Sequence, residues 1–130
     1  MSLRSPLGKV LGRGSAKQGV SHWWVQRMTA IALIPLTLWF AYQLVHLPTT
    51  DYDVVRGWIA SGVNPAWLIL FIIAVAWHSA LGIQVVLEDY VPHKGAKVAA
   101  LLANTFFHIV VAVIGSYAVL RIAFTTLSAG

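Results

Sequence analysis

Three long runs of apolar residues, each nearly free of charge, constrain the fold of this chain more than any other feature. They extend over about 24–47, 66–87 and 98–127. About 20 consecutive apolar residues carry an α-helix across the roughly 30 Å of hydrocarbon in a bilayer. The apolar character is continuous and does not alternate with polar residues, which argues against membrane-spanning strands. The sequence therefore predicts an all-α membrane protein with three transmembrane helices.

The composition agrees with a bilayer as the solvent for most of the chain. Of the 130 residues, 58% are hydrophobic and only 10% are charged, whereas roughly a quarter of a soluble domain is charged. So few charged residues could not cover a globule in water. The chain has no cysteine, which excludes disulfides, thiolate metal sites and iron–sulfur ligation by its own residues.

The segments between the apolar runs carry turn-forming residues. Residues 48–65 have room for one short amphipathic helix at the membrane surface. Residues 88–97 are predicted to form a tight turn that Pro92 and Gly95 close. Pro35 lies inside the first run, where a membrane helix tolerates a proline with a kink.

The lysines and arginines are placed asymmetrically, and this predicts the orientation of the chain. Lys94 and Lys97 lie in the second connection, Arg56 in the first, and Arg121 near the far end of the third run. The others precede or open the first run: Arg4, Lys9, Arg13, Lys17 and Arg27. By the positive-inside rule, the N-terminus and the second connection are cytoplasmic and the C-terminus lies on the opposite side.

This charge pattern divides the chain into a basic cytoplasmic tail, residues 1–23, and a three-helix membrane domain, residues 24–127. A basic segment can also indicate nucleic-acid binding. This one adjoins a membrane span and contains no aromatic residue before Trp23, which favours a tail at the membrane face or one that docks a partner. We expect the inner membrane of a bacterium, with the mitochondrial inner membrane as the alternative.

One histidine, His78, lies close to the middle of the second run. An ionisable side chain in hydrocarbon is costly and indicates a function. Ala74 and Gly82, one turn to either side, leave a face with little bulk, where a flat macrocycle could bring its iron to the imidazole. Neutral imidazole is a standard axial ligand of haem iron. Plain helix packing explains a small-residue stripe as well, and the histidine could instead bond a neighbouring helix.

The other histidines have weaker claims to ligation. His108 lies in the third run, one turn from Asn104 and beside two phenylalanines, and a structural hydrogen bond is its expected role. The remaining three fall at predicted membrane interfaces, where a solvated role is expected: His22, His46 and His93.

A second polar group is predicted at the cytoplasmic mouth of the spans. Asp89 comes eleven residues after His78, which returns it to within about 20° of the same helical face. Tyr90 follows, and Arg27 opens the first span on the same side. A tyrosine hydroxyl can donate to a quinone carbonyl, and a carboxylate–arginine pair can hold that hydroxyl in place. In the simpler interpretation, Tyr90 belongs to an aromatic belt and Arg27 reaches to the headgroups.

Two short segments carry a resemblance to a known family. The run HSALGIQVVLEDYV, from His78 to Val91, resembles the H-x-x-x-G-x-x-x-V-L-x-D-Y-V pattern of the hydrophobic membrane anchor of succinate dehydrogenase. The segment RMTAI, which begins at Arg27, resembles the R-x-T-A-I segment of the same family. Length, three spans and a basic tail also agree.

The resemblance implies a role for each matching residue. His78 would be an axial ligand of the iron of a b-type haem held with a second three-span anchor. Tyr90 would bond a ubiquinone carbonyl, with Asp89 in support, and Arg27 would lie near the haem propionates and the quinone pocket. Some members have a histidine six residues before the arginine; here that position is Ser21 and the histidine is His22, so a propionate role for His22 stays open.

The implied function is that of an anchor in respiratory complex II. The chain has no flavin or dinucleotide fingerprint, so it would not catalyse alone. Succinate would be oxidised on a flavoprotein subunit and electrons passed through an iron–sulfur subunit, both docked on the cytoplasmic face. Two alternatives stay open: the anchor of a fumarate reductase, whose direction depends on quinone and haem potentials, and a small membrane scaffold without a cofactor.

Overall fold

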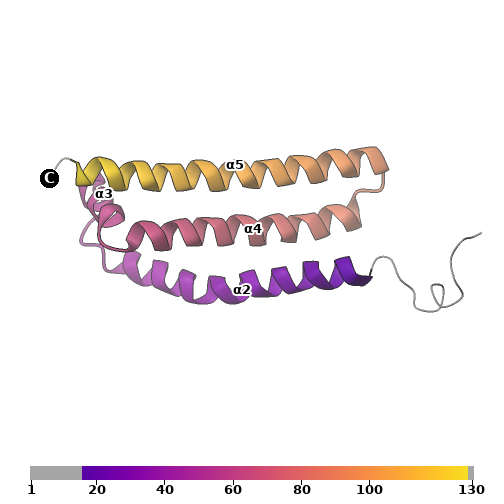
Figure 1. Cartoon of the computed structure of the whole chain (residues 1–130), viewed down its shortest axis with the longest axis horizontal. Helices are drawn as coiled ribbons and strands as arrows, with labels where there is room; N and C mark the ends of the chain where they lie inside the picture. Colours follow the sequence, from indigo (N-terminus) through magenta and orange to yellow (C-terminus); the bar gives the residue numbers. More distant parts are fainter. Residues whose placement is uncertain (1–15, 129–130) are drawn as a thin grey trace, which may run out of the picture.

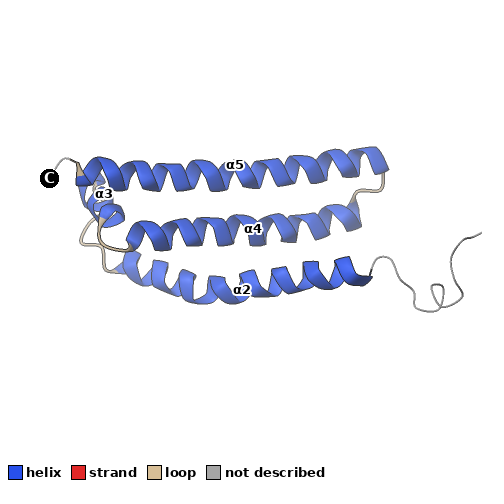
Figure 2. Cartoon of the chain, viewed as in Figure 1, coloured by secondary structure: helices blue, strands red, loops and turns tan. Residues whose placement is uncertain are grey.

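The computed structural model describes residues 16–128, and all regular structure within that range is helical (Figure 2). The helices are α2 (Ala16–Val45), α3 (Tyr52–Ala60), α4 (Asn64–Tyr90) and α5 (Lys94–Leu127). The predicted all-α class is confirmed. The short helix expected between the first two spans is α3.

Three of these helices are long and apolar enough to cross a membrane: Val20–Val45, Asn64–Tyr90 and Lys94–Thr126. They lie side by side with α4 in the middle, and α3 lies at the end where α2 finishes and α4 begins (Figure 1). α4 packs against both α2 and α5. The helix that carries His78 is therefore the central helix of the bundle.

The helix ends differ from the predicted span ends. α2 already begins at Ala16, so the predicted boundary at residue 23 falls inside a helix, while residues 1–15 of the tail lie outside the described part. α4 continues to Tyr90, and only Val91–His93 connects it to α5. The predicted role of Gly95 in closing the turn is wrong, because Gly95 lies in the first turn of α5. A hydropathy pattern marks where hydrocarbon ends, whereas a helix can continue into the headgroup region.

Proline chemistry explains where α4 stops. Val91 precedes Pro92, and a residue before proline is driven out of the helical region. Val91 has φ −93° and ψ 107°, which is extended backbone. Pro35, in contrast, lies within α2, which continues past it to Val45.

Aromatic rings hold α3 against the end of the bundle. Trp58 of α3 stacks on Trp39 of α2, with ring centroids 6.3 Å apart and planes at 25°. Trp39 also lies 6.0 Å from Trp67 of α4, and Phe40 lies 5.1 Å from Phe71. These contacts join α2, α3 and α4 at one end of the bundle.

A glycine lets α4 and α5 approach closely. A Cβ placed on Gly115 of α5 would lie 3.2 Å from Cγ2 of Ile72 on α4, closer than ordinary contact. Few apolar side chains are buried in so small a bundle: Leu36, Leu68, Ala74, Ala76, Val119 and Ala123. Most large apolar side chains on the spans face outward, as a lipid environment or further membrane subunits require.

Candidate functional site

His78 lies on the side of α4 that meets α2. Its Nδ1 is 3.0 Å from Oγ1 of Thr29, a residue of α2. Both side chains are partly buried. The histidine is thus held by a hydrogen bond from one ring nitrogen to the neighbouring span.

The other contacts of Thr29 indicate which ring nitrogen carries the proton. Its hydroxyl oxygen lies 2.9 Å from the carbonyl oxygen of Val25 and 3.0 Å from that of Gln26, both within its own helix. A carbonyl only accepts, so the single hydroxyl proton is donated there. The oxygen is then left to accept a proton from Nδ1 of His78. This favours the tautomer with its lone pair on Nε2, an atom with no hydrogen-bond partner among residues 16–128.

Two more polar side chains share this face of α2. Gln26 and His22 lie one and two turns before the level of Thr29. Both Oε1 of Gln26 and Nε2 of His22 are buried and lack a hydrogen-bond partner in the described part of the chain. Buried polar atoms are normally paired, so these two mark a place where a further group is expected.

The small-residue stripe beside His78 is partly occupied by this chain. A Cβ on Gly82 would lie 3.9 Å from Nε2 of Gln26, and Ala74 is buried. At Gly82 the stripe therefore serves helix packing against α2, as the simpler interpretation holds.

His108 makes the structural bonds expected of it. Its Nδ1 lies 2.8 Å from the carbonyl oxygen of Asn104, so that nitrogen donates. Its Nε2 lies 3.2 Å from Oγ of Ser79 on α4 and accepts from that hydroxyl. The side chain is only 8% exposed. With both nitrogens engaged, His108 ties α5 to α4 and has no lone pair left for a metal.

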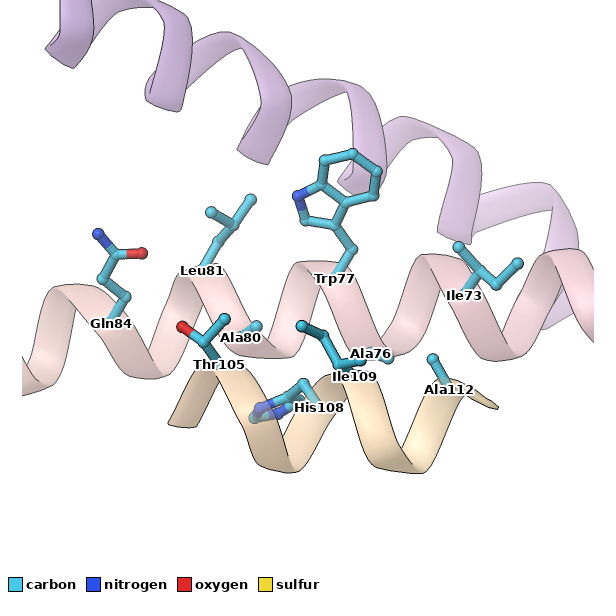
Figure 3. A pocket seen from close by; sticks show the side chains of 10 residues that line it. All are labelled: Ile73, Ala76, Trp77, Ala80, Leu81, Gln84, Thr105, His108, Ile109 and Ala112. Atoms are coloured by element: carbon cyan, nitrogen blue, oxygen red, sulfur yellow. The ribbon is translucent and has the colours of Figure 1, made fainter. Parts of the chain in front are cut away.

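A hollow of about 340 Å³ between α4 and α5 includes His108 in its wall (Figure 3). Trp77 and Leu81 of α4 and Ile109 of α5 supply much of its apolar lining. His78 is not among the lining residues. This hollow therefore lies on a different face of α4 from the candidate ligand.

The predicted quinone-site residues lie at the far end of α4. α4 runs unbroken from His78 to Tyr90, which places Tyr90 about 18 Å along the axis from the histidine. Tyr90 is 81% exposed, and Asp89 is exposed as well. The guanidinium of Arg27 lies 5.1 Å from the ring of Trp23, and no ion pair joins it to Asp89 within the described residues.

Sequence reasoning missed Thr29 and Gln26 as site residues. Thr29 stands in the quoted RMTAI segment, but its contact with His78 spans 49 positions. That contact depends on how α2 is rotated against α4. The only indication in the sequence was that these two polar residues share one face of the first span, close to its basic N-terminal segment.

Comparisons with known proteins agree on one family. The family model for the succinate dehydrogenase/fumarate reductase transmembrane subunit matches residues 1–119. A succinate dehydrogenase hydrophobic membrane anchor subunit of Rickettsia bellii is 32% identical over 106 residues, which cover 82% of this chain and 85% of that protein. A succinate dehydrogenase membrane anchor subunit of Reclinomonas americana is 28% identical over 88 residues, 65% of this chain and 73% of that one. The chain therefore belongs to the family of succinate dehydrogenase/fumarate reductase transmembrane subunits, as its histidine-to-tyrosine segment predicts.

Proposed function

We propose that this membrane anchor subunit works in a succinate:ubiquinone oxidoreductase, where His78 ligates a b-type haem and Tyr90 helps to bind ubiquinone. The observation that carries the proposal is the 3.0 Å contact between Nδ1 of His78 and Thr29. It leaves Nε2 of a mid-membrane imidazole with an unused lone pair. The family to which the chain belongs supplies the chemical context.

The groups around His78 fit a haem. A metal-bound histidine usually donates its second ring N–H to an oxygen, which fixes the tautomer and the ring orientation. Thr29 supplies that oxygen. A bound haem would take up and release single electrons. His78 would hold this haem from the present chain, together with a residue of a partner anchor, the cytochrome b subunit.

Arg27 is available for an anion near this site. Its guanidinium lies over the ring of Trp23, and its side chain is exposed. It makes no ion pair within the described residues. Its planar set of five N–H donors suits a carboxylate, so Arg27 would meet a haem propionate or line the quinone pocket.

Tyr90 would donate its hydroxyl to a quinone carbonyl. The proton of that bond counts most as negative charge builds up on the oxygen during reduction. Since Tyr90 is 81% exposed in the isolated chain, other subunits must complete the pocket. Asp89, the preceding residue, would support the site by orienting the tyrosine or a water molecule.

The reactions outside the membrane would take place on partner subunits. A flavoprotein subunit would oxidise succinate, and an iron–sulfur subunit would deliver electrons to the end of the bundle where Tyr90 lies. A fumarate reductase anchor is the second candidate, favoured only by the family description that covers both enzymes. The two differ in the potential of the quinone, which can be read from the quinone that copurifies.

The haem proposal is tested by an absorption spectrum of the complex purified with its partner subunits. His78→Leu should abolish or shift the b-type bands. His108→Leu is the matched control, because His108 lies at a comparable depth in the next span and has both nitrogens engaged. That variant should keep the spectrum. Loss of the bands in the His108 variant with retention in the His78 variant would overturn the assignment.

A further inference from the structure

A basic hollow lies at the end of the bundle remote from Tyr90. Its volume is about 480 Å³, and it is formed by α3 and by residues 114–125 of α5. Arg56 and Tyr52 line it from α3, and Arg121 and Tyr117 line it from α5. None of these four residues takes part in the haem or quinone sites proposed above.

Arg56 is held in place by α5. Its Nε donates to Oγ1 of Thr126 at 3.1 Å, and its Nη2 donates to Oγ1 of Thr125 at 3.4 Å. The hydroxyl of Thr125 itself donates to the carbonyl oxygen of Arg121 at 2.7 Å. Two of the five guanidinium N–H groups are thus used for positioning, and the others are left for a ligand.

The positive charge of this hollow is not neutralised by the described part of the chain. No carboxylate lies within ion-pair distance of Arg56 or Arg121 there, and no acidic residue lines the hollow. Arg121 is exposed and makes no side-chain hydrogen bond within residues 16–128. Two arginines therefore face one cavity with unused donors.

The hollow lies toward the C-terminal end of a helix that is long and apolar enough to cross a membrane. The stretch of α5 that meets this criterion runs over Lys94–Thr126, and Arg121 lies about 7.5 Å before its end along the helix axis. An arginine at such a depth needs an anion or must extend to the headgroups. Ile114, Ala118 and Ile122 line the same hollow. Their spacing of four forms an apolar row along one face, directed toward the middle of the membrane.

We infer that this hollow binds the phosphodiester headgroup of an anionic phospholipid. The two guanidinium groups recognise the phosphate oxygens, and the tyrosine hydroxyls donate to the remaining phosphate or glycerol oxygens. One acyl chain lies along the apolar row of α5. In this arrangement the guanidinium groups face the anionic headgroup at the membrane boundary, and the acyl chain lies against the apolar row of α5 below it. The inference is independent of the haem and quinone proposals.

The test measures lipid binding to the full chain purified with the subunits that accompany it. The complex is delipidated in detergent and titrated with phosphatidylglycerol, and bound lipid is counted by native mass spectrometry. Arg121→Gln removes a side chain that makes no hydrogen bond with the described residues, so folding should be kept. Arg56→Gln with Arg121→Gln should weaken phosphatidylglycerol binding on the order of 30-fold, since two boundary arginines are lost.

The matched control is Lys94→Gln with Lys97→Gln, which removes the same charge at the opposite end of α5. This lysine variant should bind phosphatidylglycerol as tightly as the unaltered chain. Phosphatidylcholine, which carries the same phosphodiester without net charge, should bind far more weakly than phosphatidylglycerol. Displacement of the lipid by millimolar inorganic phosphate would mean that the hollow takes a free anion and would overturn the inference. Equal binding of phosphatidylglycerol by the arginine and lysine variants would overturn it as well.

Discussion

Replacement of Thr29 by valine tests the tautomer argument directly. Valine has nearly the shape of threonine but cannot accept the proton of His78 Nδ1. The backbone carbonyls to which Thr29 donates keep their places in the helical ladder, so α2 should persist. The change therefore removes one acceptor at the α2–α4 interface and little else.

The expected effect follows from the loss of one partly buried hydrogen bond. An unpaired donor in such a place costs about 1–3 kcal/mol. Loss of an oxygen that orients a metal-bound histidine typically weakens metal affinity by roughly 10- to 100-fold. The imidazole also becomes a poorer electron donor when its N–H is no longer bonded. The ferric state is then less stabilised, and the midpoint potential of the haem should rise.

The assay is haem content per complex, followed by a redox titration of the visible α-band. Thr29→Ser keeps the oxygen and should behave like the unaltered chain. Thr37→Val is a second control, because Thr37 is exposed and lies about two turns further along α2. Helix content measured by circular dichroism should be the same in all three variants.

One outcome would refute the reasoning. If Thr29→Val bound haem fully, with unchanged bands and midpoint potential, the ring of His78 would not depend on Thr29. The haem ligand could then still be His78, but the assignment of its proton to Nδ1 would be wrong.

Three further predictions concern other parts of the chain. Tyr90→Phe should lower the rate of quinone reduction roughly ten- to a hundred-fold through loss of one hydrogen bond. The rate at which the soluble subunits reduce an artificial dye should stay unchanged. An unchanged rate of quinone reduction would mean that the quinone site lies on the partner anchor. Gly115→Leu should lower the stability of the complex by about 1–3 kcal/mol, because a Cβ there would lie 3.2 Å from Ile72. Gly57→Leu is the control and should not lower the stability, because a Cβ at Gly57 has nothing within 4 Å. Thermal unfolding of the two variants tests this prediction. A reporter fused after Gly130 should read as external by the positive-inside rule, and a cytoplasmic signal would contradict the predicted orientation.

The spans were predictable because the free energies of transferring apolar side chains into the bilayer add up along a helix. Each apolar run is longer than the bilayer requires, so small errors in the boundaries do not change the number of crossings. The helix ends were less predictable. Glu88, Asp89 and Tyr90 are polar or amphipathic, so hydropathy ends before the helix does, although all three are in α4. Only Pro92 gave a local signal for the stop.

The candidate site was predictable in part. The position of His78 in the middle of a span marks it by the cost of a polar group in hydrocarbon. Its bond to Thr29 depends on the rotation of two helices about their own axes, which hydropathy does not encode. For His108, the kind of interaction was expected, but its bond to Ser79 on α4 was not. Haem, quinone and partner roles stay predictions, since they need chains beyond this one.

The connection Val91–His93 has a consequence for how the protein enters its membrane. Fully extended, three residues reach about 10 Å, a third of the hydrocarbon thickness. α4 and α5 therefore cannot adopt their orientations independently and must cross the membrane in opposite directions. Residues 46–63 are long enough to cross the bilayer when extended, so the length of this connection does not tie the orientation of α2 to that of α4. During biosynthesis, both the orientation of α2 and that of the α4–α5 pair must be correct before α2 can pack against α4.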